Sequence, residues 1–135
     1  MTPEKLIEMA IEARKSAYAP YSGFFVGAAL LTRNGKLYTG CNIENASYTP
    51  TNCAERTAFF KAVSEGEREF EAIAIVGGKG EMPSDFCAPC GVCRQVMAEF
   101  CKPAFRVLLG GEGDAYTCHT LAELLPHGFG PDNLQ

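Results

Sequence analysis

Cysteines carry the clearest chemical signal in this sequence. Cys90 and Cys93 form a C-x-x-C pair directly after Pro89, and Cys53 starts a Cys-Ala-Glu triplet that ends at Glu55. At a helix start, a spacing of three residues brings both sulfurs of the pair to one side of the first turn. Three protein ligands with one open position is the arrangement of a catalytic zinc site. The pattern therefore predicts a zinc centre held by Cys53, Cys90 and Cys93.

Glu55 is the candidate acid–base group of this centre. It follows Cys53 closely enough to lie near the metal without binding it, which is where a side chain that moves protons is needed. The segments that begin at Cys53 and Cys90 both have helical patterns, and the positive ends of the two helix dipoles would favour thiolate over thiol. We also expect Arg56, Arg94 or both to donate a hydrogen bond to a cysteine sulfur.

Two other interpretations of the cysteines remain open at this point. A C-x-x-C pair also occurs in thiol–disulfide oxidoreductases, but there it follows the first long strand, whereas three expected strands precede it here. A purely structural zinc site would have four protein ligands and no need for Glu55. His119 and His127 lie far downstream and do not have ligand spacing. The residues therefore favour a catalytic metal and leave a structural one possible.

Charge and hydropathy narrow the class of partner. The net charge of −4 and the isoelectric point near 5.2 argue against a polynucleotide ligand, which needs a basic surface. No apolar run approaches the roughly 20 residues that span a bilayer. Residues 1–15 contain several glutamates and do not resemble a secretory leader. We therefore expect a cytoplasmic protein without a membrane partner, whose seven cysteines stay reduced.

Hydrophobic periodicity predicts one α/β domain over residues 1–135. The expected helices are 3–18, 53–65, 91–101 and 120–125, and the expected strands are 24–32, 36–43, 70–77, 104–109 and 115–118. Asn34-Gly35 is a hairpin signal, so the first two strands should be antiparallel. Helices between the later strands act as crossovers, and the sheet should therefore be mixed.

Four segments together resemble the zinc-dependent cytidine deaminase family, over residues 5–129. They are YSGFFVGAA from Tyr21, CNIENASY from Cys41, CAERTA from Cys53 and PCGVCRQ from Pro89. Cys-Ala-Glu followed by Pro-Cys-x-x-Cys is the signature of the family, here with cysteine rather than histidine as the first ligand. The chain resembles the short, homotetrameric members. This resemblance implies an α/β fold built as a three-layer α/β/α sandwich with a mixed sheet of about five strands.

The resemblance also implies an activity. Members of this kind hydrolyse cytidine and 2′-deoxycytidine to uridine and 2′-deoxyuridine, releasing ammonia, in pyrimidine salvage. One Zn²⁺ per subunit would be held by the three cysteines, with Glu55 moving the protons and Arg56 supporting a ligand sulfur. Asn42 and Glu44 would bind the ribose hydroxyls. Phe24 would line the pocket, and the backbone N–H of Ala54 would help to hold the base carbonyl.

Two aromatic residues are expected to act across subunits. By the same resemblance, Phe129 near the C-terminus would reach the base in a partner's pocket, and Tyr48 would cross an interface. We therefore expect a homotetramer whose pockets are shared between subunits.

Several points stay open in the sequence. Deaminases of nucleoside antibiotics share these motifs, and polynucleotide deaminases share the zinc core, although the acidic charge and the Asn42–Glu44 segment argue against the latter. The choice between cytidine and deoxycytidine is open, as is the role of Arg94. The remaining cysteines are expected to be small buried side chains: Cys41, Cys87, Cys101 and Cys118.

Overall fold

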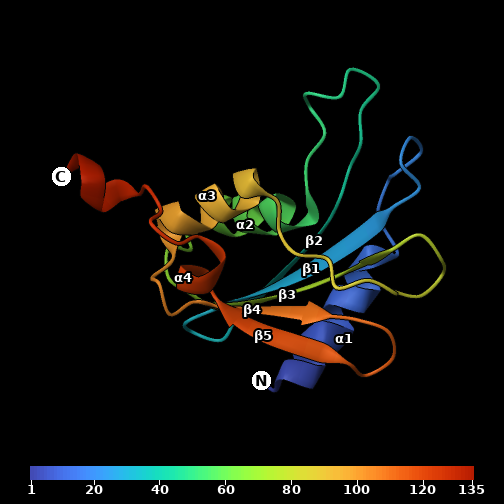
Figure 1. The fold of residues 1–135 in the computed structure, drawn as a ribbon, viewed down its shortest axis with the longest axis horizontal. Helices are drawn as coiled ribbons and strands as arrows, with labels where there is room; N and C mark the ends of the chain where they lie inside the picture. The colour runs from blue at the N-terminus through green and yellow to red at the C-terminus, as the bar shows by residue number, and fades with distance from the viewer.

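A five-stranded open sheet in the order β2-β1-β3-β4-β5 forms the centre of the molecule (Figure 1). The structure is a computed structural model that describes all 135 residues. The strands are β1 (Phe25–Thr32), β2 (Leu37–Cys41), β3 (Phe70–Gly78), β4 (Arg106–Gly110) and β5 (Tyr116–Thr120). β3 and β4 are parallel and the other neighbouring pairs are antiparallel. The prediction of a mixed sheet of about five strands is confirmed.

Helices cover both faces of the sheet and make three layers (Figure 1). They are α1 (Pro3–Arg14), α2 (Ala54–Ser64), α3 (Gly91–Phe100), the short α4 (Leu121–Leu124) and the 3₁₀ helix η1 (Pro131–Leu134). α1 packs on one face, and α2 and α3 pack on the other. None of these helices is both long and apolar enough to cross a membrane.

The face under α1 is made of small side chains. Leu6, Ile7 and Ala10 of the helix pack on alanines of β1 and β3, such as Ala29 and Ala74. Small residues let the helix approach the sheet closely. At Gly27 of β1 the approach is closest, because a Cβ there would collide with the α1 backbone. This contact fixes the C-terminal turn of α1 over the start of β1.

The opposite face carries the larger core. Phe59 of α2 is fully buried and contacts a ring of aromatic side chains. These side chains are Phe70, Phe100 and Phe105. At Gly40 of β2 a Cβ would collide with the backbone of Ala54 and Ala58, so the first turn of α2 lies directly on the sheet.

Strand direction explains where the helices begin. β2 and β3 are both antiparallel to β1, so β2, β3 and β4 run the same way. α2 follows β2 and α3 follows β3, so both helices begin at the carboxyl edge of the sheet. That edge is where α/β folds place their ligand sites.

The first helix is shorter than its periodicity predicts. We expected it to extend to residue 18, but it ends at Arg14. The reason is tertiary: Tyr18 leaves the helix to pair with the loop after β2. Its N–H donates to the carbonyl of Asn42, and its own carbonyl accepts from the N–H of Glu44, both at 2.9 Å. The 3₁₀ helix η1 was not expected from the sequence.

Candidate metal centre

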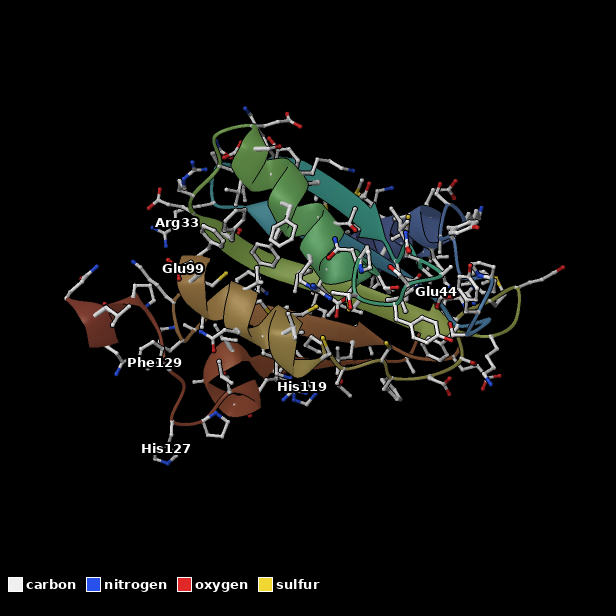
Figure 2. All side chains as sticks on the ribbon, turned by 90° about the horizontal axis from the view of Figure 1, so that it is seen from above. Arg33, Glu44, Glu99, His119, His127 and Phe129 are labelled. Atoms are coloured by element: carbon white, nitrogen blue, oxygen red, sulfur yellow. The ribbon has the colours of Figure 1, made fainter.

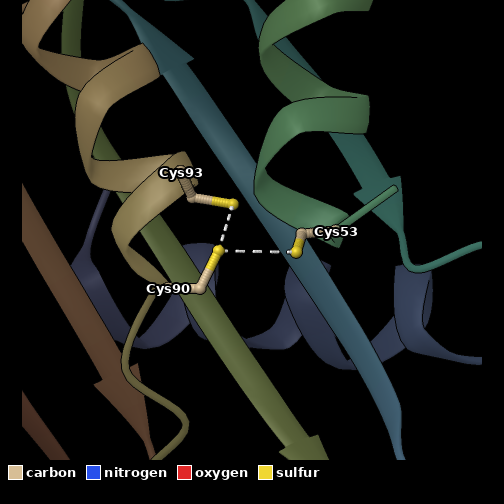
Figure 3. Close-up of side chains that lie close together, drawn as sticks. All are labelled: Cys53, Cys90 and Cys93. Carbon is tan, nitrogen blue, oxygen red and sulfur yellow. Dashed lines mark hydrogen bonds between the residues drawn. The ribbon is translucent and has the colours of Figure 1, made fainter. Parts of the chain in front are cut away.

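Three thiols meet at the carboxyl edge of the sheet (Figure 3). Cys53 is the N-cap of α2, Cys90 is the N-cap of α3, and Cys93 lies in the first turn of α3. The Sγ atoms of Cys90 and Cys93 are 3.6 Å apart, and those of Cys53 and Cys90 are 3.8 Å apart. Sulfurs bound at 2.3 Å around a tetrahedral zinc would be separated by about 3.8 Å. The three side chains therefore fit one zinc ion and leave its fourth position free of protein.

Hydrogen bonding favours ionised sulfur at Cys53. Neither cap cysteine uses its side chain to cap its own helix, so the sulfurs face one another. The pKa of Cys53 is lowered to about 5, chiefly by a hydrogen bond from Cys93. A hydrogen bond from Arg56 acts in the same direction, and burial opposes both. Thiolate is the form that binds zinc. Cys53 thus fits a metal ligand in charge as well as in position, whereas the same hydrogen bond raises the pKa of Cys93.

The two arginines beside the ligand motifs have different partners. Nη2 of Arg56 donates to Sγ of Cys53 at 3.3 Å, as we expected for at least one of them. Arg94 instead donates to two backbone carbonyls, of Pro89 at 2.7 Å and of Leu124 at 2.6 Å. Arg94 is therefore a bridge between the start of α3 and α4, and it is neither a sulfur partner nor a freely solvated side chain.

Glu55 is a buried carboxyl beside the thiols. It lies in the first turn of α2 with only 4% of its surface exposed. Burial, with a further contribution from the charge on Cys53, raises its pKa to about 7. A carboxyl with that pKa can both accept and donate a proton near neutral pH. Its neighbour Ala54 is fully buried at the first helical position.

Glu44 is held by the loop before β1. Its carboxylate accepts from the backbone N–H groups of Tyr21 at 2.9 Å and Ser22 at 3.1 Å, and from the Ser22 hydroxyl. These bonds, led by the one from the Ser22 hydroxyl, lower the pKa of Glu44. The carboxylate lies in a shallow groove whose other lining residues include Tyr48 and Thr51. Tyr48 is 73% exposed, with a backbone φ of 65°.

Asn42 is tied to the backbone of the first strand. Its Oδ1 accepts from the N–H of Val26 at 2.9 Å, and its Nδ2 donates to the carbonyl of Phe24 at 2.8 Å. Only 9% of the residue is exposed. Whatever it contacts in a ligand, Asn42 positions Phe24, an effect that sequence reasoning missed.

Cys87 lies beside Phe24 at the edge of the site. A Cβ at Gly77 would lie 2.9 Å from the Phe24 ring and 3.0 Å from Cβ of Cys87, so these three residues meet. Burial, with smaller contributions from charges that include Glu55, raises the pKa of Cys87 to about 12. It therefore stays a neutral thiol beside the pocket, outside the group of three cysteines that can hold a metal.

Phe129 lies far from the rest of the predicted site. Figure 2 shows it on the C-terminal extension, at the opposite end of the long axis from Glu44. Its carbonyl accepts from Nε2 of Gln95 at 2.8 Å, which fastens the extension to α3. The two residues therefore cannot contact one ligand within a single chain. His119 and His127, also labelled in Figure 2, take no part in the thiol cluster.

Comparison with known proteins agrees with this geometry. Residues 1–109 match the model of the cytidine and deoxycytidylate deaminase zinc-binding region. The chain belongs to this deaminase family. The match contains both metal-ligand motifs and the segments around Phe24 and Glu44. Cys53, Cys90 and Cys93 lie within this zinc-binding region and are positioned to bind a metal ion.

Relatives match over almost the whole chain. A cytidine deaminase of Sporosarcina psychrophila is 53% identical over 135 residues, covering 99% of this chain and 96% of the relative. One of Halalkalibacterium halodurans is 52% identical, covering 99% and 98%. The crystal structure of cytidine deaminase from Burkholderia pseudomallei superposes with a TM-score of 0.88 at 51% identity, over 96% of this chain and all of that one. The expected three-layer deaminase fold is thereby confirmed.

Proposed function

We propose that residues 1–135 form one catalytic domain that hydrolyses cytidine and 2′-deoxycytidine to uridine and 2′-deoxyuridine, releasing ammonia. The observation that carries this proposal is the buried carboxyl of Glu55 beside three thiols that leave one metal position open. Family membership and the cytidine deaminases of similar sequence support the choice of a cytosine nucleoside.

The protein side chains divide the work of the reaction. Cys53, Cys90 and Cys93 would hold zinc, which when bound supplies Lewis-acid activation of water. Glu55 takes a proton from the attacking water and delivers it to N3 of the ring. It then takes the proton of the new hydroxyl on C4 and delivers it to the amino group, which leaves as ammonia. Its burial keeps the pKa near neutrality, so one carboxyl can serve in each of these steps. Arg56 offsets the negative charge of the sulfur ligands.

The groove lined by Glu44 and Tyr48 would take the sugar. Glu44 presents a carboxylate held in place by Ser22, which suits it to accept from ribose hydroxyls. Asn42 lies two residues earlier in the chain and would share this task while it holds Phe24 against the pocket. The backbone N–H of Ala54 would donate to the base carbonyl.

Each pocket would be built from residues of more than one subunit. Because Phe129 lies at the far end of the chain from Glu44, it could serve a pocket only in another subunit (Figure 2). We propose that Phe129 and the exposed Tyr48 act in this way within a homotetramer that works in the cytoplasm in pyrimidine salvage. Replacing Phe129 by alanine should raise KM for cytidine without unfolding the subunit, and an unchanged KM would count against the shared pocket.

A single experiment tests the proposed reaction. Zinc-loaded protein is incubated with cytidine, 2′-deoxycytidine and adenosine, and the ultraviolet spectrum and ammonia release are followed. The two cytosine nucleosides should be converted and adenosine should not. Glu55→Gln keeps the volume of the buried side chain, so it should retain zinc and lose about 10²–10⁴-fold in rate. No turnover of either cytosine nucleoside by the zinc-loaded protein would refute the proposal, and turnover confined to a modified nucleoside would point to an antibiotic deaminase.

A further inference from the structure

Arg14 is a buried arginine without an acidic partner. It is the last residue of α1, only 6% of its surface is exposed, and it makes no ion pair. A buried guanidinium needs acceptors for its N–H groups, because an unpaired buried charge is strongly unfavourable. Arg14 therefore has a role that its own helix does not explain.

Four backbone carbonyls surround the guanidinium of Arg14. Nε donates to the carbonyl of Phe25 at 2.9 Å, and Nη1 donates to that of Glu81 at 2.9 Å. Nη2 donates to the carbonyls of Gly78 at 2.6 Å and Gly80 at 2.5 Å. The guanidinium also lies over the ring of Phe25, 5.9 Å from its centroid. The planar fork is satisfied by backbone oxygens alone.

These carbonyls belong to the two segments that flank the pocket. Phe25 directly follows Phe24, the proposed pocket wall. Gly78 ends β3, and residues 79–81 begin the β3–α3 loop, which continues through Cys87 to Cys90 and runs beside the end of α1 in Figure 1. Arg14 is therefore a single side chain that joins the Phe24 strand to the loop that delivers a metal ligand.

The backbone is arranged to bring Arg14 to this place. The close approach of α1 at Gly27 puts the Arg14 backbone directly over β1. From there the five N–H donors of the guanidinium, which lie in a fixed fork, reach acceptors on both segments. Burial lowers the pKa of Arg14, but an arginine stays protonated in any solvent in which the enzyme works.

We propose that Arg14 is a positioning residue that holds the β3–α3 loop against the first strand and so keeps Cys87 packed beside Phe24, the proposed wall of the nucleoside pocket. The kinetic part of this inference rests on the proposed function. Its structural part, that Arg14 controls the loop, does not.

The test uses Arg14→Gln, Arg14→Lys and the matched control Lys15→Gln on the full zinc-loaded protein. Lys15 is the adjacent cation, is solvent-exposed and pairs only with Glu12. Amide hydrogen exchange is followed by mass spectrometry, and zinc content, kcat and KM for cytidine are measured. Arg14→Gln should speed exchange in residues 78–87 at least tenfold and leave the β4–β5 hairpin unchanged. KM should rise about tenfold with little change in kcat, because Glu55 is on α2. For Arg14→Lys, both the exchange rate and KM should lie between those of wild type and those of Arg14→Gln.

The outcomes separate positioning from general stability. Faster exchange in residues 78–87 only, with a KM effect that lysine partly rescues, supports the proposal. Uniformly faster exchange, or an unchanged KM in folded Arg14→Gln, overturns it. If Arg14→Gln does not fold, Arg14→Lys decides by the same two readouts. If wild-type protein does not convert cytidine, the proposed function fails, and local exchange in the variants still shows whether Arg14 holds the loop.

Discussion

The guanidinium of Arg56 donates to the sulfur of Cys53 across 3.3 Å within the first turn of α2. An arginine three residues after a ligand on the same helix lies on the same face as that ligand. Its positive charge therefore lies next to the Cys53 sulfur. Substituting Arg56, which is not a ligand, would therefore change the net charge of the metal site.

Replacing Arg56 should weaken zinc binding. Arg56→Gln removes the charge and the hydrogen bond to Cys53, and groups that support metal ligands typically contribute about 10–100-fold in affinity. We expect a loss of that size in a competition titration against a chelator. Arg68→Gln is the control, because Arg68 contacts only backbone carbonyls at the other end of α2. Equal zinc affinity in Arg56→Gln and wild type would contradict this role.

Chelation should change which cysteines can be alkylated. The expectation that Cys118 is buried was wrong, because it lies exposed on the edge strand β5. With zinc bound, Cys118 should therefore be labelled quickly, since it also lies outside the cluster. Removing zinc should add Cys90 first, because its side chain is exposed, and then Cys53 and Cys93. Mass spectrometry of peptides after pulsed alkylation identifies the sites, and Cys118→Ser removes the background. Rapid labelling of Cys90 in zinc-loaded protein would show that it is not a ligand.

Ser22 should set the pH range over which Glu44 is ionised. The Ser22 hydroxyl is the largest cause of the lowered pKa of Glu44, so Ser22→Ala should raise that pKa. If the ionised form accepts from the ribose as proposed, KM for cytidine should begin to rise at a higher pH as the solution is acidified. The other titratable side chains that line the groove are the phenols Tyr21 and Tyr48. The ¹³C shift of the Glu44 carboxyl reports the pKa directly.

The control for Ser22 comes from the same groove region. Ser47→Ala removes a hydroxyl that bonds to the side chain of Asn45 and leaves Glu44 untouched. Its KM profile against pH should coincide with that of wild type. A Glu44 titration in Ser22→Ala that matches wild type would mean that the backbone N–H groups alone hold the carboxylate.

Adding one methyl group at Gly40 should destabilise the start of α2. The new Cβ would collide with the backbone of Ala54 and Ala58, and overpacking typically costs about 1–3 kcal/mol. Gly91→Ala is the matched control, because nothing lies within 4 Å of a Cβ there and the position is helical. Urea denaturation of both variants measures the difference. Equal midpoints would show that α2 can move away from β2 freely.

Local rules predicted most of the fold because the sequence follows them. Asn34-Gly35 placed the hairpin, and apolar periodicity placed the strands and the inner helices. The first helix was predicted four residues too long, because the bonds of Tyr18 to Asn42 and Glu44 are tertiary and no window around Tyr18 contains them.

The candidate site also has parts that local sequence patterns predict and parts that they do not. Ligand spacing within Cys90–Cys93 is local, and the shared direction of β2 and β3 brings Cys53 to it, so the metal cluster could be expected. Two features of the site depend on close backbone approach at glycines: the carbonyls around Arg14 and the contact of Cys87 with Phe24. A glycine has no side chain whose type would indicate such a contact in the sequence. The roles of Tyr48 and Phe129 stay predictions.

Phe129 and Glu44 lie at opposite ends of one subunit (Figure 2), and this separation has a genetic consequence. If a partner's Phe129 completes each pocket, Glu55→Gln and Phe129→Ala subunits are each defective, but in different halves of a pocket. A mixed assembly would then contain some pockets with an intact Glu55 from one subunit and an intact Phe129 from the other. Two inactive alleles expressed in one cell would thereby complement each other. The unit on which selection acts would then be the assembled oligomer.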